Sequence, residues 1–413
     1  MKKVLIIGFV WPEPTTTAAG TRMLQLITIF KKYGLEIHFV STSAKTPQSY
    51  NFSKDGIKTS TIELNNTSFN NFIIEYNPDI VLFDRYLTEE QFGWRVTENC
   101  PNALKILDTE DLHFLRFARE KSYKNNIEIN DYLLNNEITK REIASIYRCD
   151  LTLIISIYEL ELLIHKFKID TNLLCYTPFL LDKLTTDSYT KRPTFNKRVD
   201  FMTIGNFKHK PNLEAVKTLK KHIWPKIKSK LPKANIQIYG AYGDNQSITQ
   251  LHNTKEGFLI KGWVKNKEIA FSNARICLAP LQFGAGLKGK LIDAMIYGTP
   301  SITTSIGAEG INTELPWAGF IENDFDAFIE KAIILYKNEE IWLKKQQNGI
   351  EIINTCFSKN KFGNELMLKI ETIFSDLENH RNQNFIGSML QHHTLKSTKY
   401  MSKWIEEKNK KLN

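Results

Sequence analysis

The 413-residue sequence has no run of about 20 consecutive apolar residues, the length that a transmembrane helix needs. The short apolar segment 4–7 near the amino terminus is soon interrupted by Gly8 and by the prolines at positions 12 and 14. No A-x-A-type cleavage site follows at the distance typical of a signal peptide. We therefore interpret this segment as a buried first strand.

Cysteine is scarce: the five residues Cys100, Cys149, Cys175, Cys277 and Cys356 are scattered, odd in number and never in C-x-x-C spacing. This pattern argues against a disulfide framework and against a zinc site, and it indicates reduced thiols in a cytoplasmic protein. Because the cysteines lack the spacing of metal ligands, we expect no bound metal.

Acidic residues are outnumbered, with 45 Asp and Glu against 55 Lys and Arg, which gives a net charge of +10. A positive net charge suits binding to nucleic acid, to an anionic membrane surface or to an anionic small substrate. Because no motif typical of nucleic-acid binding combines aromatic with basic residues, nucleic acid is the least favoured of these three partners. The segment from Lys396 to Lys411 holds six lysines, Tyr400 and Trp404. It suits peripheral contact with the anionic inner face of a membrane, although a disordered basic tail is the favoured interpretation.

Short apolar runs alternate with helical patterns along most of the chain, which indicates α/β architecture with mainly parallel sheets. In the first half, strands are expected at residues 4–7, 37–40, 80–83, 104–107, 151–155 and 173–176. The polar stretch 185–198 carries no periodicity and is the expected linker. The pattern then restarts, with strands at 199–204, 236–239, 258–260, 276–279 and 301–304 and a helix at 211–231.

This restart predicts two domains, residues 1–185 and 199–356. We expect residues 357–385 to form a helix that packs back toward the first domain, followed by a basic tail over 386–413.

The segment 280–311 is the most informative part of the sequence. It reads as a strand end, a loop with Gly284, Gly286 and Gly289, an amphipathic helix and another strand. Glycines before a helix let backbone N–H groups approach an anion, and the helix N-terminus adds partial positive charge. Lys288 and Lys290 add full charges at the same place, so a phosphate is the expected ligand. An ordinary strand-to-helix turn with solvated lysines is the alternative.

The helix of this segment reads DAMIYGTP over residues 293–300 and leads into an apolar strand. It resembles the signature E-A-M-A-x-G-x-P of family 4 glycosyltransferases, also called glycosyl transferases group 1. Segments 9–22, 107–113, 201–212 and 260–264 resemble further parts of this family in the same order. The resemblance implies the GT-B fold, in which two Rossmann-like domains face each other across a central cleft.

The resemblance also implies a function: transfer of a sugar, with retention of configuration, from a nucleotide-diphosphate sugar to a glycan, lipid-linked or other hydroxyl acceptor. Such enzymes build surface polysaccharides and glycoconjugates, and the family needs no metal and no cofactor besides its donor substrate. His113 is the implied catalytic residue, and Arg22 and Asp111 lie on the acceptor side. The implied donor-binding residues are Gly20, Asn206, Lys208, Lys210, Val264, Gly284, Gly286, Lys288, Asp293 and Glu309.

Two positions depart from the family pattern. The family has two glutamates eight positions apart in the donor site, where this chain has Ala285 and Asp293. Asn206 stands where many members have arginine, so Lys208 and Lys210 become the better candidates for contact with the diphosphate. Ala285 keeps open the alternative of a catalytically impaired module that scaffolds a glycan-assembly complex. A nucleotide-sugar epimerase is a further alternative, but no acidic constellation supports it.

Several of these residues also have ordinary interpretations. His113 could be a solvated or core histidine that follows a strand. Asp111, together with Asp108 and Glu110, could bind an acceptor hydroxyl or belong to a solvated loop, and a sugar contact by Glu309 is the less favoured of its two interpretations.

Overall fold

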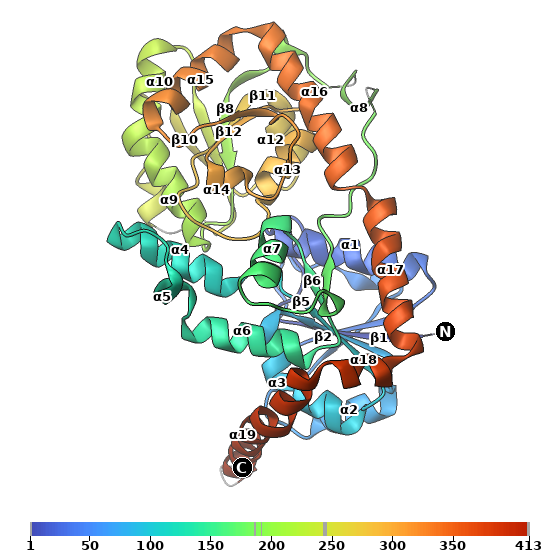
Figure 1. Ribbon diagram of the computed structural model, residues 1–413. Helices are drawn as coiled ribbons and strands as arrows, with labels where there is room; N and C mark the ends of the chain where they lie inside the picture. Colours follow the sequence, from blue (N-terminus) through green and yellow to red (C-terminus); the bar gives the residue numbers. More distant parts are fainter. Residues whose placement is uncertain (1, 186, 191, 243–245, 411–413) are drawn as a thin grey trace.

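The computed structural model describes residues 2–185, 187–190, 192–242 and 246–410. The chain forms two α/β domains stacked on each other, each built on a parallel sheet with helices on both faces (Figure 1). The expectation of two Rossmann-like domains is thereby confirmed.

The sheet of the first domain has seven strands in the order β3-β2-β1-β4-β5-β6-β7. Three of these strands are buried along their whole length and three more at all but one terminal residue, as expected for a parallel sheet that is covered on both faces. The strands are β1 (Lys3–Gly8), β2 (Glu36–Ser41), β3 (Lys58–Thr61), β4 (Ile80–Asp84), β5 (Leu104–Asp108), β6 (Leu151–Ile154) and β7 (Leu174–Tyr176).

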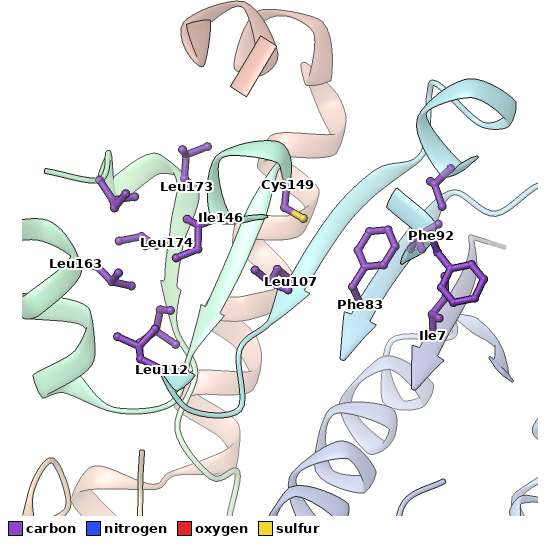
Figure 2. Close-up of a cluster of buried hydrophobic side chains, with 14 of the residues drawn as sticks. Ile7, Phe83, Phe92, Leu107, Leu112, Ile146, Cys149, Leu163, Leu173 and Leu174 are labelled. Carbon is purple, nitrogen blue, oxygen red and sulfur yellow. The ribbon is translucent and has the colours of Figure 1, made fainter. Parts of the chain in front are cut away.

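Alternate side chains of these strands feed two apolar cores, one on each face of the sheet. Figure 2 shows the first, in which Ile7, Phe83 and Leu107 meet residues from the covering helices. The helices of this domain are α1 (Ala18–Lys32), α2 (Ser68–Tyr76), α3 (Arg85–Asn99), α4 (His113–Asn125), α5 (Asp131–Leu134), α6 (Glu137–Arg148) and α7 (Ile157–His165).

The sheet of the second domain has six strands in the order β10-β9-β8-β11-β12-β13. They are β8 (Val199–Ile204), β9 (Ile236–Tyr239), β10 (Phe258–Gly262), β11 (Ala274–Ala279), β12 (Ser301–Thr303) and β13 (Gly319–Ile321). The helices are α9 (Lys210–Thr218), α10 (Trp224–Lys230), α11 (Gln246–Thr249), α12 (Lys267–Asn273), α13 (Gly289–Ile296), α14 (Ser305–Ala308), α15 (Phe325–Lys337) and α16 (Glu339–Cys356).

The helix expected over residues 211–231 is interrupted in the structure. A π-helical stretch, Leu219–Ile223, separates α9 from α10. Pro225, the second residue of α10, lies just after this stretch, and because proline has no N–H to donate to the preceding turn, a local change of helical hydrogen bonding is the expected response.

The chain crosses between the domains twice. The stretch 185–198, expected to lack regular structure, contains the short helix α8 (Asp187–Thr190) and a single turn over Phe195–Lys197. After α16 the chain returns to the first domain as α17 (Lys359–Ser375), whose Phe362, Leu366 and Ile370 join the second of that domain's cores. Figure 1 shows α17 running beside the first domain.

The end of the chain differs from the favoured expectation of a disordered tail. After α18 (Leu377–Gln383), residues Phe385–Lys410 form the 26-residue helix α19, which packs on α3 and α6. Two short strands, β3 and β13, were also missing from the sequence-based prediction. Within the described ranges, no helix combines the length and the apolar character needed to cross a membrane.

Candidate functional site

A cavity of about 250 Å³ lies between the two domains. The first domain contributes Trp11 and Glu13 of the loop after β1, Gly20 of α1, and the ends of β4 and β5. The second domain contributes Asn206, Lys208 and Tyr242. Because the carboxyl ends of parallel strands are where ligands bind in open α/β sheets, this cavity is the candidate active site.

The glycine-rich loop lies at the N-terminus of α13, facing the first domain. Gly284 and Gly286 have φ of +146° and +62°, so both adopt backbone conformations that favour glycine. The Lys288 Nζ donates to the carbonyl oxygens of Ala285 and Gly286, and the Lys290 Nζ donates to Asn212 Oδ1 at 2.7 Å. In the part of the chain that the structure describes, neither ammonium group forms an ion pair within 4.0 Å.

Burial lowers the pKa of both Lys288 and Lys290 to about 8. Two cations that lie close together and partly out of water stabilise any anion that enters between them. The loop therefore has the electrostatics of an anion site, and the carboxyl groups of Glu309, Glu159 and Asp111 already attract the Lys288 ammonium group from a distance.

The loop is clamped by residues of the first domain. Glu159 Oε1 accepts hydrogen bonds from the N–H groups of Leu112 at 3.1 Å and of Gly286 at 2.7 Å, which belong to different domains. Arg119 donates to Gly284 O at 2.9 Å and binds both carboxylate oxygens of Glu309 at 2.7 Å. Glu309, a predicted sugar-binding residue, is therefore engaged with Arg119 in this structure.

Burial, together with the Asp111 carboxylate, raises the pKa of Glu159 to about 8. The ionised form of Glu159 is thus disfavoured at the position where one of its oxygens bridges the domains.

An acidic group lines the cavity where β4 and β5 end. Burial raises the pKa of Asp84, and burial together with the Asp108 and Asp84 carboxylates raises the pKa of Glu110 well above its ordinary value. Asp84 Oδ1 is buried and accepts no hydrogen bond from the described residues, although Arg85 Nε lies 3.7 Å away. Arg85 and Glu110 have φ of +73° and +63°, a strained conformation for residues with side chains.

His113, the predicted catalytic residue, begins α4 beside the cavity. Its Nδ1 lies 3.1 Å from Asp111 O and 3.3 Å from Glu142 Oε1, and its ring meets Tyr86 edge to face. Asp111 binds Arg116, which lowers the pKa of its carboxyl despite burial. Neither His113 nor Asp111 lines the cavity itself.

Arg22 requires a correction, because it is not available as an acceptor contact. Only 1% of its side chain is exposed, and it binds Asp108 through Nε at 3.1 Å and Nη2 at 2.8 Å. Its remaining Nη1 donates to the carbonyl oxygens of Thr177 and Pro178. Arg22 therefore connects α1 to β5 and to the residues after β7, and its role is to stabilise the structure beside the cavity.

The loop after β8 brings three predicted donor residues to the domain boundary. Asn206 and Lys208 line the cavity, and Lys208 Nζ lies 3.8 Å from the centre of the Tyr242 ring. Lys210 Nζ instead binds Glu120 of the first domain at 2.8 Å. Tyr242 donates to Glu13 Oε2 at 2.8 Å and closes the cavity from the second domain.

Asp293, Val264 and Ala285 lie away from the cavity lining. Asp293 Oδ1 accepts from Lys267 at 2.6 Å, and Val264 packs on the apolar cluster around Met202 and Phe271. Ala285 is buried and joins the first-domain core shown in Figure 2. A glutamate at position 285 would therefore enter an apolar interface.

Sequence reasoning missed Glu13, Asp84, Arg85, Arg119, Glu159 and Tyr242. Apart from the neighbours Asp84 and Arg85, each has a partner that lies many residues away in the sequence, and no local spacing marks these residues. Arg85 and Asp84 directly follow a predicted strand, which is the one signal that could have drawn attention to them. Within the described ranges, no cluster of three His, Cys, Asp or Glu side chains is arranged to hold a metal ion.

The two domains, which face each other across this cavity, have the GT-B fold. Residues 198–338 match the family model described as glycosyl transferases group 1, the family that the sequence of this domain resembles.

Three solved structures illustrate the likeness of the whole chain. One is a mutant of S. aureus TarM in complex with fondaparinux, alpha-GlcNAc-glycerol and UDP, which is 11% identical in sequence and has a TM-score of 0.68. The match covers 91% of this chain and 100% of the TarM chain. Sucrose-phosphate synthase from Thermosynechococcus elongatus is 14% identical with a TM-score of 0.66 and the same coverage. Anabaena HepE in complex with UDP is 11% identical with a TM-score of 0.63, covering 90% of this chain and 100% of its own. No curated protein sequence matches the chain.

Proposed function

We propose that this protein is a glycosyltransferase that moves a sugar from a nucleotide-diphosphate sugar to a hydroxyl acceptor with retention of configuration. The observation that carries the proposal is the glycine-rich loop with Lys288 and Lys290, whose ammonium groups have a pKa of about 8 and, among the described residues, form no ion pair within 4.0 Å. A diphosphate leaving group supplies negative charge that can pair with both ammonium groups. The group 1 match of the same domain supports this assignment.

In this proposal the lysines and the N-terminus of α13 stabilise the negative charge that develops as the nucleoside diphosphate departs. Asp293 binds the ribose after exchanging its contact with Lys267, and the backbone near Val264 borders the base.

Because the lysines supply the positive charge, we propose that the reaction needs no metal. Activity that persists unchanged in EDTA supports this part of the proposal, and activity that requires added Mg²⁺ or Mn²⁺ refutes it.

The acceptor lies on the side of the first domain in this proposal. The cavity there is lined by Glu13, Asp84 and Glu110, carboxyl groups that suit the hydroxyls of a sugar or another polyol. Asp84 Oδ1 accepts no hydrogen bond from the described residues and can take one from an incoming hydroxyl. His113 orients the reacting groups from the edge of the cavity. We place the protein in the synthesis of polysaccharides or glycoconjugates in the cytoplasm.

A panel of nucleotide sugars tests the proposal. UDP-sugars come first, because UDP is present in the TarM and HepE structures, and GDP-sugars follow. The readouts are donor hydrolysis and transfer to simple glycosides, with the anomeric configuration of the product determined by NMR. Turnover of one donor with a retained anomer is expected. Inversion would refute retention, and the absence of binding to every donor would favour the alternative of a scaffold module.

The alternative function, a catalytically impaired scaffold module, is based on Ala285, which stands where the family has a carboxylate near the transferred sugar. Its burial in the apolar interface shows that this position serves contact between the domains.

A further inference from the structure

Helix α19 carries an unusual distribution of polar and apolar side chains. Its face toward the first domain is polar: Ser402 and Glu406 are buried, and both bind Arg95 of α3. On the same side, Gln391 donates to Arg148 O and Lys399 pairs with Glu98. Hydrogen bonds and ion pairs of these described side chains therefore help to hold the helix on α3 and α6.

Exposed apolar side chains lie on the opposite face, near the two ends of the helix. Six residues, which we call the outer stripe, have side chains between 44% and 75% exposed: Phe385, Ile386, Met389, Tyr400, Met401 and Trp404. Spacings of three and four residues, such as 386–389 and 400–404, place neighbours on the same side of a helix. Single exposed apolar residues are common, but a set that follows one helix face marks an interaction surface.

The charges beside the outer stripe favour an anionic partner. The segment Phe385–Lys410 holds five lysines and two glutamates, and one of these glutamates, Glu406, faces inward against Arg95. Lys403 and Lys408 are exposed beside the stripe, and Lys408 Nζ lies 5.3 Å from the centre of the Trp404 ring. Two such helices would repel each other, so the charge disfavours a second copy of this chain as the partner.

We propose that the outer stripe of α19 is a docking surface for an anionic lipid bilayer. The helix lies along the surface, with Tyr400 and Trp404 in the headgroup region and the lysines near lipid phosphates, an arrangement that suits interfacial helices. The polar face, which would meet water in an isolated amphipathic helix, is here fixed to the protein. Figure 1 shows that α19 lies at the end of the first domain far from the second domain, so docking leaves the second domain free to move.

Vesicle flotation with the full chain tests this proposal. We compare vesicles of phosphatidylcholine alone with vesicles containing about 30% phosphatidylglycerol. The wild-type protein is expected to bind the anionic vesicles about tenfold more tightly. The Tyr400→Ser/Trp404→Ser variant is expected to lose about tenfold in binding to them, whereas Tyr132→Ser, at a tyrosine that is 87% exposed in the first domain, is expected to bind normally.

The intrinsic fluorescence of Trp404 gives a second readout. Five of the seven tryptophans are buried, and the other exposed one is Trp263. In a Trp263→Phe background, anionic vesicles should shift the emission to shorter wavelength, and a soluble quencher should lose access to Trp404.

Three outcomes overturn the proposal: equal binding of the double variant and the wild type, no binding to anionic vesicles, or a concentration-dependent dimer that the double variant abolishes. The last result would assign the outer stripe to a second copy of the chain. Thermal unfolding and nucleotide binding of each variant verify that it is folded.

Discussion

At the scale of single residues, Ala285 and Arg22 show how burial decides a role that the sequence leaves open. Ala285 differs from the family pattern at a position expected to touch the sugar, yet its side chain packs into the core of the opposite domain. Arg22 lies in a segment expected over the acceptor, yet all its hydrogen-bonding groups serve Asp108 and two carbonyls. In both cases the contact partner lies about 80 or more residues away in the sequence.

Restoring the family glutamate at position 285 should therefore impair the protein. A carboxylate placed in this apolar interface would either lose its hydration or force the domains apart. We expect Ala285→Glu to lower sugar transfer at least tenfold, with Ala285→Ser as a smaller polar control that keeps most activity. Steady-state kinetics with the preferred donor measure the effect. Increased activity of Ala285→Glu would show that position 285 faces the sugar.

At the scale of elements, α17 ties the end of the chain to the first domain. Leu366 is fully buried between α17 and the sheet, whereas Leu368 on the same helix is 65% exposed. Leu366→Ala should lower the free energy of unfolding of the first domain by about 2–5 kcal/mol, because it leaves a cavity. Leu368→Ala, which removes the same atoms from an exposed site, should change it by less than about 1 kcal/mol. Denaturant titration compares the two, and equal effects would contradict the packing described for α17.

Sequence patterns predicted the buried strands well, because a strand covered on both faces must be continuously apolar. They failed for β3, a Lys-Thr-Ser-Thr edge strand, and for β13, which has only three residues. Neither carries an apolar run long enough to stand out.

The glycine-rich loop was predictable because its residues are adjacent in the sequence. The contacts that Glu159 and Arg119 make with this loop were not predictable, because they form only when distant helices pack together in the folded protein. For α19, lysine-rich composition suggested disorder, and the contacts of Arg95 with Ser402 and Glu406 were invisible in the sequence.

At the scale of the whole molecule, the structure shows a closed arrangement of the two domains. Contacts from α4 and α7 hold the glycine-rich loop, and the Tyr242–Glu13 hydrogen bond joins the two domains at the cavity. Closure of this kind excludes water from the site and would limit hydrolysis of the donor.

Arg119 is the strongest of these cross-domain contacts, since it binds Glu309 through both oxygens and also Gly284 O. Removing one partner of a buried ion pair costs about 3–5 kcal/mol, which would shift the closure equilibrium on the order of 1,000-fold toward the open form. Small-angle scattering should then show a larger radius of gyration for Arg119→Ala than for Lys121→Ala, an exposed control on the same helix. Identical scattering from the two variants would contradict the role of Arg119 in closure.

The central claim is that Lys288 and Lys290 hold the donor diphosphate, and the pH dependence of donor affinity tests it most directly. The pKa of each ammonium group is about 8 in the free protein, and a bound diphosphate raises it, so affinity is full below pH 8 and falls as pH rises through it. Calorimetry should show a loss of about tenfold between pH 7 and pH 9 for each lysine that must be charged. Lys288→Ala should bind much more weakly and with less dependence on pH, whereas the exposed control Lys233→Ala should match the wild type. Equal donor affinity of Lys288→Ala and the wild type across this range would contradict the account.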